Sequence, residues 1–435
     1  MAAADDLAHL LRRTEFFPKP ARIAELTALG SDPAAWVTNI LDFTANANPQ
    51  VPANLVNQDD QHGYDQHVAA YNWWLDSMAT RPRPFQEKMT LFWHGHFVSE
   101  WNFVNRTDHM THQNQLYRTM ALGNFEALTQ AMAIEPAMIL YLSNSENVKT
   151  APNQNFAREL MELFTLGVGN YTEDDVNTAA RAWTGYNYDY TTHAFEYRSS
   201  RHDDGQKTLF GNTQNWNGPD MIHEILVGNP DKRVISATFI VKELWQFLAY
   251  PAPAQNIVDD LATVFMTGGL ELKPLLQALL VRPEFYSAQA KQGLVRTPTE
   301  WAAAILAATG TTSGALGLFN LAGRMGQVVF DPPNVSGWRS NGYWLTTSAL
   351  SGRAAVARKA ASLWANDNFA LVVNQSADGA VNSVAQMFGV YPLSNQSYAS
   401  ILGAHQAERA ASNNAKTTAA NLLVLVMLTG EMNVG

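Results

Sequence analysis

The chain has 435 residues, of which 46% are hydrophobic and only 16% are charged, a composition that excludes an intrinsically disordered protein. Lys and Arg number 29 against 39 Asp and Glu, and the resulting net charge of −10 argues against a nucleic-acid-binding protein. Cysteine is absent, which excludes disulfides, iron–sulfur clusters, thiolate zinc sites and a cysteine nucleophile. Any metal must therefore be held by His, Asp or Glu.

The sequence leaves two alternatives for localisation. No run of about 18 apolar residues occurs, so we expect no membrane span. Met1 is followed by three alanines and two aspartates, without the basic stretch and apolar core of a leader peptide. The protein is either cytosolic, or exported with its leader removed and a start codon added.

Helical spacing of apolar residues dominates the chain, as at Leu7, Leu10 and Leu11. Asp32-Pro33 and the Thr172–Asp175 capping box are typical helix starts. The expected helices cover, in chain order, residues near 7–11, 33–41, 67–78, 84–93, 105–120, 125–133, 136–142, 153–166, 172–185, 218–227, 233–248, 254–266, 271–281, 298–308, 316–327, 346–363, 381–388, 397–411 and 419–428.

One segment, 186–211, breaks the helical pattern. Tyr186, Tyr188 and Tyr190 alternate, and Phe195 and Tyr197 alternate back after a short turn, which predicts a β-hairpin and the one sheet of the chain. No repeat of 20–50 residues and no Pro/Ser-rich linker occurs. We therefore predict a mainly α fold: one large bundle-like helical domain over 1–435, with two lobes meeting near residue 230.

The first candidate site is His94-Gly95-His96, directly after Phe92-Trp93. Because Gly95 indicates the end of a helix, both imidazoles can face one site, as a pair of metal ligands or an acid/base pair. The alternative is that both histidines are core residues that cap backbone carbonyls beneath their aromatic neighbours.

The second candidate is the helix around Arg158-Glu159. Its residues Asn155, Glu159 and Glu162 form a polar stripe beside an apolar face, and the two carboxylates repel each other at i, i+3. We expect Arg158, a metal or a shared proton to offset that repulsion, with Arg158–Glu162 as an i, i+4 ion pair. Such a helix is largely buried, and buried carboxylates are paired or have a raised pKa.

Two loops complete the candidates. The turn 201–207 carries His202, Asp203 and Lys207 as candidate functional residues. The alternative is a solvent-exposed Asp-Gly turn without a functional role. The loop 330–338 contains two prolines, Asn334 and Trp338, and either forms a binding loop or plugs the core.

The chain resembles the bacterial family called domain of unknown function 1800. The resemblance rests on residues 83–97, 122–125, 136–142, 155–169, 171–185, 202–207 and 330–338. It departs at Gly95, where Asn is common, and at Ser143, where the family usually shows Asp. The resemblance implies a mostly helical bacterial protein, commonly exported and often encoded beside an exported, sulfatase-like partner. It also implies that the His pair, the Arg-Glu-x-x-Glu helix and the His-Asp-x-x-x-Lys turn are family motifs.

These observations lead to a hydrolase or lyase that is exported and acts on a polysaccharide or similar polymer. Glu159 is the expected general acid or base, and Asp203 or Asp331 the better second carboxylate, because residues on one helix lie too close for a glycosidase pair. The expected catalytic residues are Glu159, Glu162, Arg158, His202, Asp203 and Lys207. The expected substrate-binding residues are Trp93, Asn155, Asn334 and Trp338, and the expected ligands of a divalent metal are His94 and His96, with Glu159 or Glu162.

The alternative comes from another class of function. In it the protein is a non-catalytic binding or assembly protein of the cell envelope, and the same motifs form a buried polar network that fixes the core. Convergence of Glu159, His94 and His202 on an open pocket favours the enzyme. Sealed and hydrogen-bonded side chains favour the structural role.

Overall fold

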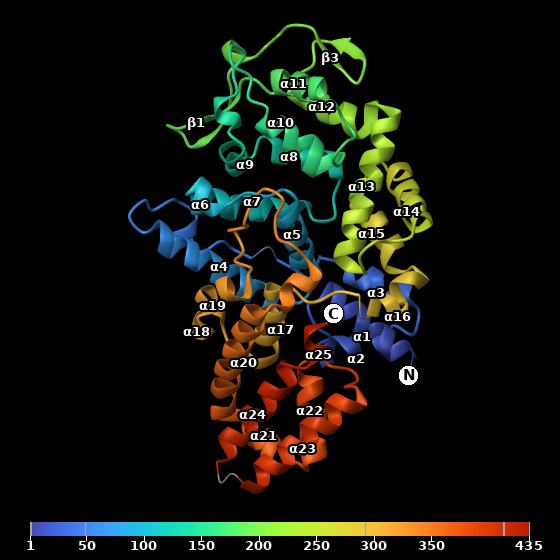
Figure 1. Cartoon of the computed structure of the whole chain (residues 1–435), viewed down its shortest axis with the longest axis vertical. Helices are drawn as coiled ribbons and strands as arrows, with labels where there is room; N and C mark the ends of the chain where they lie inside the picture. The colour runs from blue at the N-terminus through green and yellow to red at the C-terminus, as the bar shows by residue number, and fades with distance from the viewer. Residues whose placement is uncertain (1, 48, 292, 412–413, 435) are drawn as a thin grey trace.

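The computed structural model describes residues 2–47, 49–291, 293–411 and 414–434. Within these ranges the chain forms 25 α-helices and two small antiparallel sheets, so the predicted mainly α fold class is confirmed. Figure 1 shows the hairpins at one end of the molecule and the C-terminal helices at the other. None of the helices in this part of the chain combines the length and apolar character needed to cross a membrane.

The first third of the chain builds the middle of the body (Figure 1). Local signals start several of its helices: the Asp32 side chain accepts from the Ala34 amide, and Pro33 occupies the first helical position. The helices are α1 (Ala2–Thr14), α2 (Pro20–Thr27), α3 (Pro33–Ile40), α4 (Gly63–Thr80), α5 (Phe85–His96), α6 (Trp101–Val104), α7 (Thr107–Met120), α8 (Phe125–Ala133) and α9 (Pro136–Tyr141), with short 3-10 turns η1 (Ala53–Leu55) and η2 (Asn144–Glu146).

The next segment carries both sheets. The predicted hairpin is confirmed, since Tyr186 pairs with Tyr197 and Asp189 with Ala194. A second hairpin was not predicted, because its strands are three residues each and lack alternating aromatic residues. The elements are α10 (Asn155–Glu159), the π-helix η3 (Leu160–Thr165), α11 (Glu173–Ala182), β1 (Tyr186–Asp189), β2 (Ala194–Tyr197), η4 (Ser199–Arg201), β3 (Lys207–Leu209), β4 (Asn212–Gln214), α12 (Gly218–His223) and the π-helix η5 (Glu224–Gly228).

The remainder of the chain is helical. In Figure 1 the pair α13–α14 runs along one side, and α20–α24 form the end opposite the hairpins. The elements are α13 (Pro230–Leu248), α14 (Gln255–Thr267), α15 (Leu272–Leu280), η6 (Pro283–Tyr286), α16 (Ala288–Lys291), α17 (Pro298–Thr309), α18 (Ser313–Leu316), α19 (Leu318–Met325), η7 (Asn341–Leu345), α20 (Thr347–Asn368), α21 (Ala370–Val373), α22 (Ala377–Met387), α23 (Asn395–Ala411), α24 (Ala415–Met427) and α25 (Gly430–Asn433).

Buried side chains fall into two hydrophobic clusters. The first takes residues from α1, α3, α5, α8, α11 and α13–α15, and the second from α4, α17, α20, α22 and α24. Along the second half of the chain the change from one cluster to the other falls between Ala290 and Trp301. The lobe boundary near residue 230 stays a prediction.

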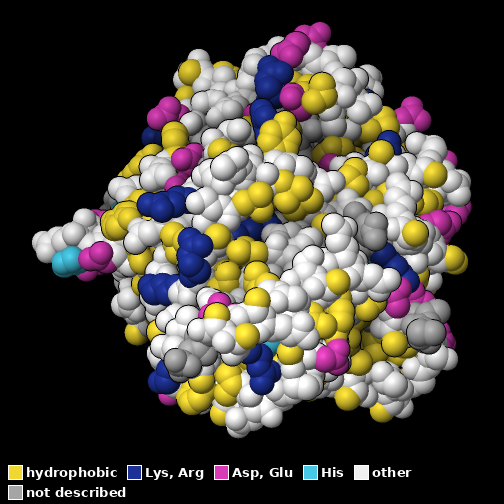
Figure 2. All heavy atoms as spheres, turned by 60° about the horizontal axis from the view of Figure 1, so that its bottom comes forward, with side chains coloured by type: hydrophobic (Ala, Val, Ile, Leu, Met, Phe, Trp, Pro, Cys, Tyr) yellow, Lys and Arg dark blue, Asp and Glu magenta, His cyan; other side chains and the backbone are white. Residues whose placement is uncertain are grey.

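The surface matches the low charge content. Figure 2 shows one face on which hydrophobic side chains form several separate patches, with Lys and Arg in small groups and Asp and Glu scattered between them. No single charged area therefore dominates this face.

Candidate functional site

The two histidines of the first motif lie on the last turn of α5 and face different neighbours. His94 is buried, and its Nε2 accepts a hydrogen bond from the Phe330 amide at 3.0 Å. His96 is also buried, and its Nε2 donates to the Phe164 carbonyl at 3.0 Å. Burial lowers the pKa of His94 to about 3 and that of His96 to about 4, so both imidazoles are neutral at pH 7.

This arrangement does not fit the expected metal centre. The lone pair of His94 Nε2 is occupied by a backbone amide. No group of three or more His, Asp or Glu side chains in the described ranges is arranged to hold a metal ion. A structural or catalytic zinc site needs at least three protein ligands, and the described surroundings of His94 and His96 do not supply them.

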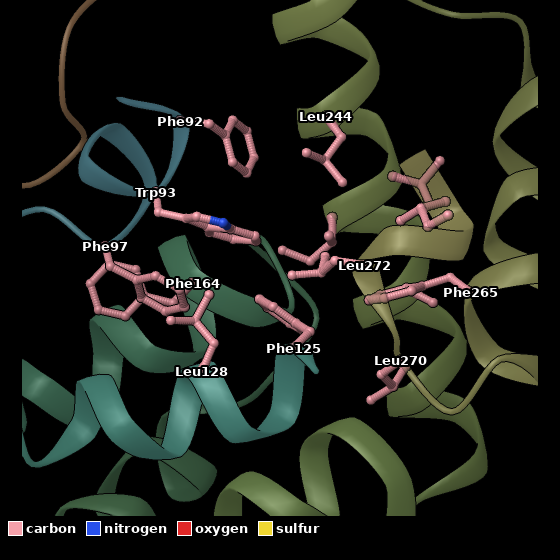
Figure 3. Close-up of a cluster of buried hydrophobic side chains, with 14 of the residues drawn as sticks. Phe92, Trp93, Phe97, Phe125, Leu128, Phe164, Leu244, Phe265, Leu270 and Leu272 are labelled. Atoms are coloured by element: carbon pink, nitrogen blue, oxygen red, sulfur yellow. The ribbon is translucent and has the colours of Figure 1, made fainter. Parts of the chain in front are cut away.

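Trp93 is a core residue rather than a substrate platform. Its ring is fully buried, and its Nε1 donates to the Ala121 carbonyl at 3.3 Å. Figure 3 shows it among Phe92, Phe97 and Phe125, and the Trp93 and Phe125 rings stack with centroids 5.9 Å apart. Neither face of the indole is open to a ligand.

The Arg-Glu-x-x-Glu segment is not one continuous α-helix. It begins as α10 and widens at Leu160 into the π-helix η3, a geometry found frequently at functional sites. The expected Arg158–Glu162 ion pair is absent: Arg158 pairs with Glu173 at 2.8 Å, and Glu162 accepts from the Tyr171 hydroxyl. The wider π-turn changes the direction of the side chains that follow Glu159, so the α-helical i, i+4 rule does not apply.

Glu159 differs from its neighbours in having no hydrogen-bond partner among the described residues. It is half-buried, and its pKa is raised by burial first and by the nearby Glu162 carboxylate second. Arg158 opposes the shift weakly, because its guanidinium is committed to Glu173. A half-buried carboxyl group with a raised pKa is typical of a general acid.

Three further acidic groups are linked to Glu159 by a chain of pairwise interactions, in which Tyr141 interacts with Glu159 and Glu100, and Glu100 interacts with Asp331. The pKa of Tyr141 is raised to about 12 by burial, then by Glu100 and then by Glu159, which places its hydroxyl within electrostatic range of both carboxylates. Burial raises the pKa of Glu100, with a further contribution from Asp331. Burial also raises the pKa of Asp331, which accepts a hydrogen bond from the Asn102 side chain. We call Glu100, Tyr141, Glu159 and Asp331 the acidic cluster.

Sequence reasoning found half of the acidic cluster. The sequence predicts functional carboxylates at Glu159 and Asp331 but no role for Glu100 or Tyr141. Glu100 follows α5 by a few residues and lies in no periodic pattern. The backbone bond from Trp101 N to Phe330 O at 2.7 Å, which brings its loop beside Asp331, is a long-range contact without a local signal.

The His202–Lys207 turn is a closed structural unit. His202 is buried with Nδ1 2.7 Å from the Thr184 carbonyl, and Asp203 forms an ion pair with Arg181 at 2.7 Å. Lys207 is buried and donates to the Gly205 carbonyl and to Asn215. None of these side chains forms a hydrogen bond or ion pair with a member of the acidic cluster, so the turn is not the second half of a catalytic site with Glu159.

Three buried asparagines, which sequence reasoning missed, hold the first hairpin in place. Asn147 donates to Asn144 and to the Ala180 carbonyl, and Asn187 donates to the backbone of both Asn144 and Asn147. Asn144 donates to the Tyr186 carbonyl at 2.7 Å. The network fixes the position of β1 relative to the loop after α9.

The remaining predicted substrate residues lie at or near the surface. Asn155 is exposed at the start of α10, and Asn334 is exposed with its Oδ1 accepting from the Ser336 amide. Trp338 is half-buried with its ring 5.5 Å from that of His94. Of these residues, Asn334 and Trp338 share the 330–338 loop with Asp331.

A groove lies beside the acidic cluster, along β1. A hollow of about 380 Å³ is lined by Phe103, Leu140, Tyr188 and Tyr190 among others, and an adjoining hollow of about 540 Å³ shares Tyr190 with it. Phe103 is 59% exposed and Tyr190 63% exposed, so both rings are available to a ligand. The Phe103 ring also contacts Tyr141, with centroids 5.6 Å apart, which connects the groove to the acidic cluster.

Comparison with known proteins gives one match. A family described as "Protein of unknown function (DUF1800)" matches residues 9–434, nearly the whole chain. Searches of curated proteins and of solved structures each found no match.

Proposed function

Because the chain belongs to the DUF1800 family, whose description names no activity, we propose from its geometry that it hydrolyses a neutral polysaccharide or similar polymer. The observation that carries the proposal is Glu159: a half-buried carboxyl group with a raised pKa and no hydrogen-bond partner in the described ranges. A carboxyl group with a raised pKa keeps its proton to a higher pH than an ordinary glutamate does, and it can deliver that proton to a leaving oxygen.

In this proposal the two carboxyl groups that glycoside hydrolysis needs are Glu159 and Asp331, which are connected through Tyr141 and Glu100. Protonated Glu159 gives its proton to the glycosidic oxygen as the bond from that oxygen to the anomeric carbon breaks. A water molecule attacks the anomeric carbon and gives its proton to Asp331. Two hydroxyl-ended products leave, and solvent exchange returns the proton to Glu159. Tyr141, which lies within range of Glu100 and Glu159, is positioned to hold a substrate hydroxyl.

The surroundings favour hydrolysis over a lyase reaction and a neutral substrate over an anionic one. A lyase that removes a proton beside a sugar carboxylate needs cations to neutralise that carboxylate. Beside Glu159, Arg158 is engaged by Glu173, while the exposed Lys149 and Arg201 line the adjoining hollow rather than the acidic cluster. The acidic cluster repels a polyanion, whereas the exposed Phe103 and Tyr190 rings offer faces on which sugar rings stack.

The test is a screen of neutral polysaccharides for new reducing ends, with three variants. We expect Glu159→Gln and Asp331→Asn to lower the rate at least about 100-fold, since a positioned general acid or base contributes 10²–10⁴. Asp174→Asn is the matched control, because Asp174 is an exposed carboxylate on α11 outside the acidic cluster. Full activity in Glu159→Gln, or no cleavage of any polymer by the wild type, contradicts the proposal.

A second candidate function rests on a different observation. His94, His96 and His202 are buried and hydrogen-bonded to backbone groups, as expected for a non-catalytic binding or assembly protein. Wild-type protein that retains a polymer on affinity gels without releasing any product supports this second function over hydrolysis.

Export and an exported, sulfatase-like partner belong to the same proposal. If the protein is exported, fractionation of cells that express the native gene should recover it outside the cytoplasm. We expect the sulfatase-like protein to co-purify with the wild type. If it docks on the groove, it should no longer co-purify when Phe103 and Tyr190 are both replaced by Ser.

A further inference from the structure

A second cluster of charged side chains, of the opposite sign, lies away from the acidic cluster. It surrounds a cavity of about 60 Å³ between α1, α5 and the segment that leads into α17. Arg12, Arg13, Lys88 and Arg296 line it, and Glu300 is the only carboxylate among the described residues that line it. We call these five residues the basic cavity.

The hydrogen-bond partners of the three arginines leave donors unused. Arg13 is 4% exposed and donates from Nη2 to the carbonyls of Ala249 and Ala290, while its Nε has no partner. Arg296 is also 4% exposed and has an unpartnered Nε, and among the described residues its side chain donates only to the Met432 sulfur, at 3.5 Å. Arg12 donates no hydrogen bond to any residue in the described ranges.

Charges inside the basic cavity do not balance. Glu300 forms its ion pair with Lys88 and also caps α17, so it is not available to the arginines. Asp5 lies near Arg12, but its carboxylate is bound to Lys291 at 2.6 Å. Burial, with a contribution from neighbouring cations, lowers the pKa of Arg13 and of Arg296 to about 9 each. The buried Arg13 and Arg296 and the partly exposed Arg12 thus share this space without a free counter-charge among the described residues, an arrangement that proteins avoid for buried charges unless an anion completes it.

We propose that the basic cavity binds one small doubly charged oxyanion, phosphate or sulfate, through Arg12, Arg13 and Arg296. The planar guanidinium fork matches such an anion, and its unused N–H groups become partnered on binding. The cavity suits a small ion and is too small for a drug-sized ligand, which needs roughly 300–1,000 Å³.

The location gives the anion a structural consequence. Phe16, which lines the cavity just after the end of α1, belongs to the second hydrophobic cluster, whereas Leu10 and Leu11 on α1 belong to the first. An oxyanion bound by Arg12 and Arg296 therefore connects α1 to the segment before α17, at the place where the two clusters meet. This inference does not depend on the proposed hydrolysis.

The test uses the full chain in anion-free buffer and titrates sodium phosphate or sodium sulfate, with sodium chloride at matched ionic strength as the reference. We expect a saturable rise in melting temperature of about 3 °C or more with either oxyanion, and a one-to-one isotherm by calorimetry. No rise beyond that given by chloride overturns the proposal.

Variants locate the binding. Arg12→Gln is expected to weaken phosphate binding at least about tenfold and to melt at the same or a higher temperature than the wild type in anion-free buffer, since it relieves repulsion at no cost in hydrogen bonds. Arg12→Lys is expected to restore part of the affinity. Arg358→Gln, the same charge change on the exposed face of α20, should bind as the wild type does. Equal loss in Arg12→Gln and Arg358→Gln overturns the proposal, because it reports net charge only.

A third arm separates a free ion from the group of a larger molecule. Glycerol phosphate is titrated beside inorganic phosphate at the same ionic strength. Tighter binding of inorganic phosphate shows a closed site for a free ion, and tighter binding of glycerol phosphate shows a site for the phosphate group of a larger ligand. Both results support an oxyanion site, whereas binding of neither contradicts it.

Discussion

Glu159 holds its proton more tightly in the folded protein than in the unfolded chain, because burial and the Glu162 carboxylate both disfavour its ionised form. A group whose folded pKa is raised contributes most stability below its unfolded pKa, about 4.3. That contribution is lost as the pH rises through the folded pKa. Above its folded pKa, the ionised Glu159 side chain therefore destabilises the folded protein.

The first prediction concerns Glu159→Gln. This variant removes the ionisable group and its destabilising effect, so it should melt about 1–2 °C above the wild type at pH 7. The difference in melting temperature should disappear below about pH 4, where both side chains are neutral. Thermal melts at a series of pH values measure both features. A variant that melts several degrees lower at pH 7 would show instead that Glu159 is a member of a paired structural network.

At the same scale, local rules explain which pairs the sequence predicts. The Thr172–Asp175 capping box forms as expected, because all of its atoms lie within one turn. The Arg158–Glu162 pair does not form, because Glu173 and Tyr171 come from the far side of a loop and the π-turn redirects Glu162. Residues that come together only in the folded protein cannot be paired from their spacing in the sequence.

At the element scale, the first hairpin depends on the loop that enters it. Gly185 has φ +82°, donates to the Asn147 carbonyl and accepts from the Arg198 amide. A Cβ at this position would lie 2.7 Å from the Arg198 carbonyl oxygen, so no side chain fits. The glycine joins the asparagine network to β2.

The second prediction compares two glycines of equal backbone conformation. Gly211 also has φ +82°, but a Cβ there would meet nothing within 4 Å. We expect Gly211→Ala to cost about 1 kcal/mol in the free energy of unfolding, and Gly185→Ala about 2–3 kcal/mol, since only the latter adds a clash. Urea unfolding of both variants measures the difference. Equal costs would mean that the clash is relieved by movement of the hairpin.

The sequence predicts the first hairpin but not the second, for a reason that belongs to this scale. Alternating tyrosines mark β1, whereas β3 and β4 are short and polar. Their position depends on Thr178, which donates to the Thr208 carbonyl at 2.8 Å from α11. A contact between elements, not a local pattern, makes that strand.

At the scale of the whole molecule, buried neutral histidines set the response to acid. Burial lowers the pKa to about 3 for His94 and to about 4 for each of His67, His96 and His109. The unfolded value is about 6.5. A histidine with a lowered folded pKa contributes stability above the unfolded pKa, and that stability is lost as the pH falls toward the folded pKa.

The third prediction is a steep loss of stability between pH 6.5 and 4. Four such groups give a slope of about 5 kcal/mol per pH unit, while the carboxyl groups with raised pKa values act in the opposite direction near their own pKa. Circular dichroism and urea unfolding at each pH measure the slope. Stability that stays constant from pH 7 down to 4.5 would contradict the buried neutral state.

The fourth prediction isolates one of these groups. His67 stacks on Trp101 with ring centroids 4.3 Å apart, and His67→Phe keeps a ring there while removing the proton site. The slope of stability against pH should fall by about 1.4 kcal/mol per pH unit.

At the scale of the whole molecule the sequence predicts the fold class, because the helical spacing of apolar residues repeats along nearly the entire chain. The two hydrophobic clusters and the basic cavity could not be predicted. They bring α1 against residues near 296, and nothing in the spacing of apolar residues records which helices meet.

The central claim is that Glu159 is a carboxyl group with a raised pKa and no hydrogen-bond partner, available to donate a proton. The most direct measurement is a ¹³C NMR titration of protein labelled at the glutamate side-chain carboxyl carbons, with the Glu159 signal assigned by its loss in Glu159→Gln. The account predicts a pKa clearly above the ordinary glutamate value of about 4.3. A pKa at or below that value would contradict it.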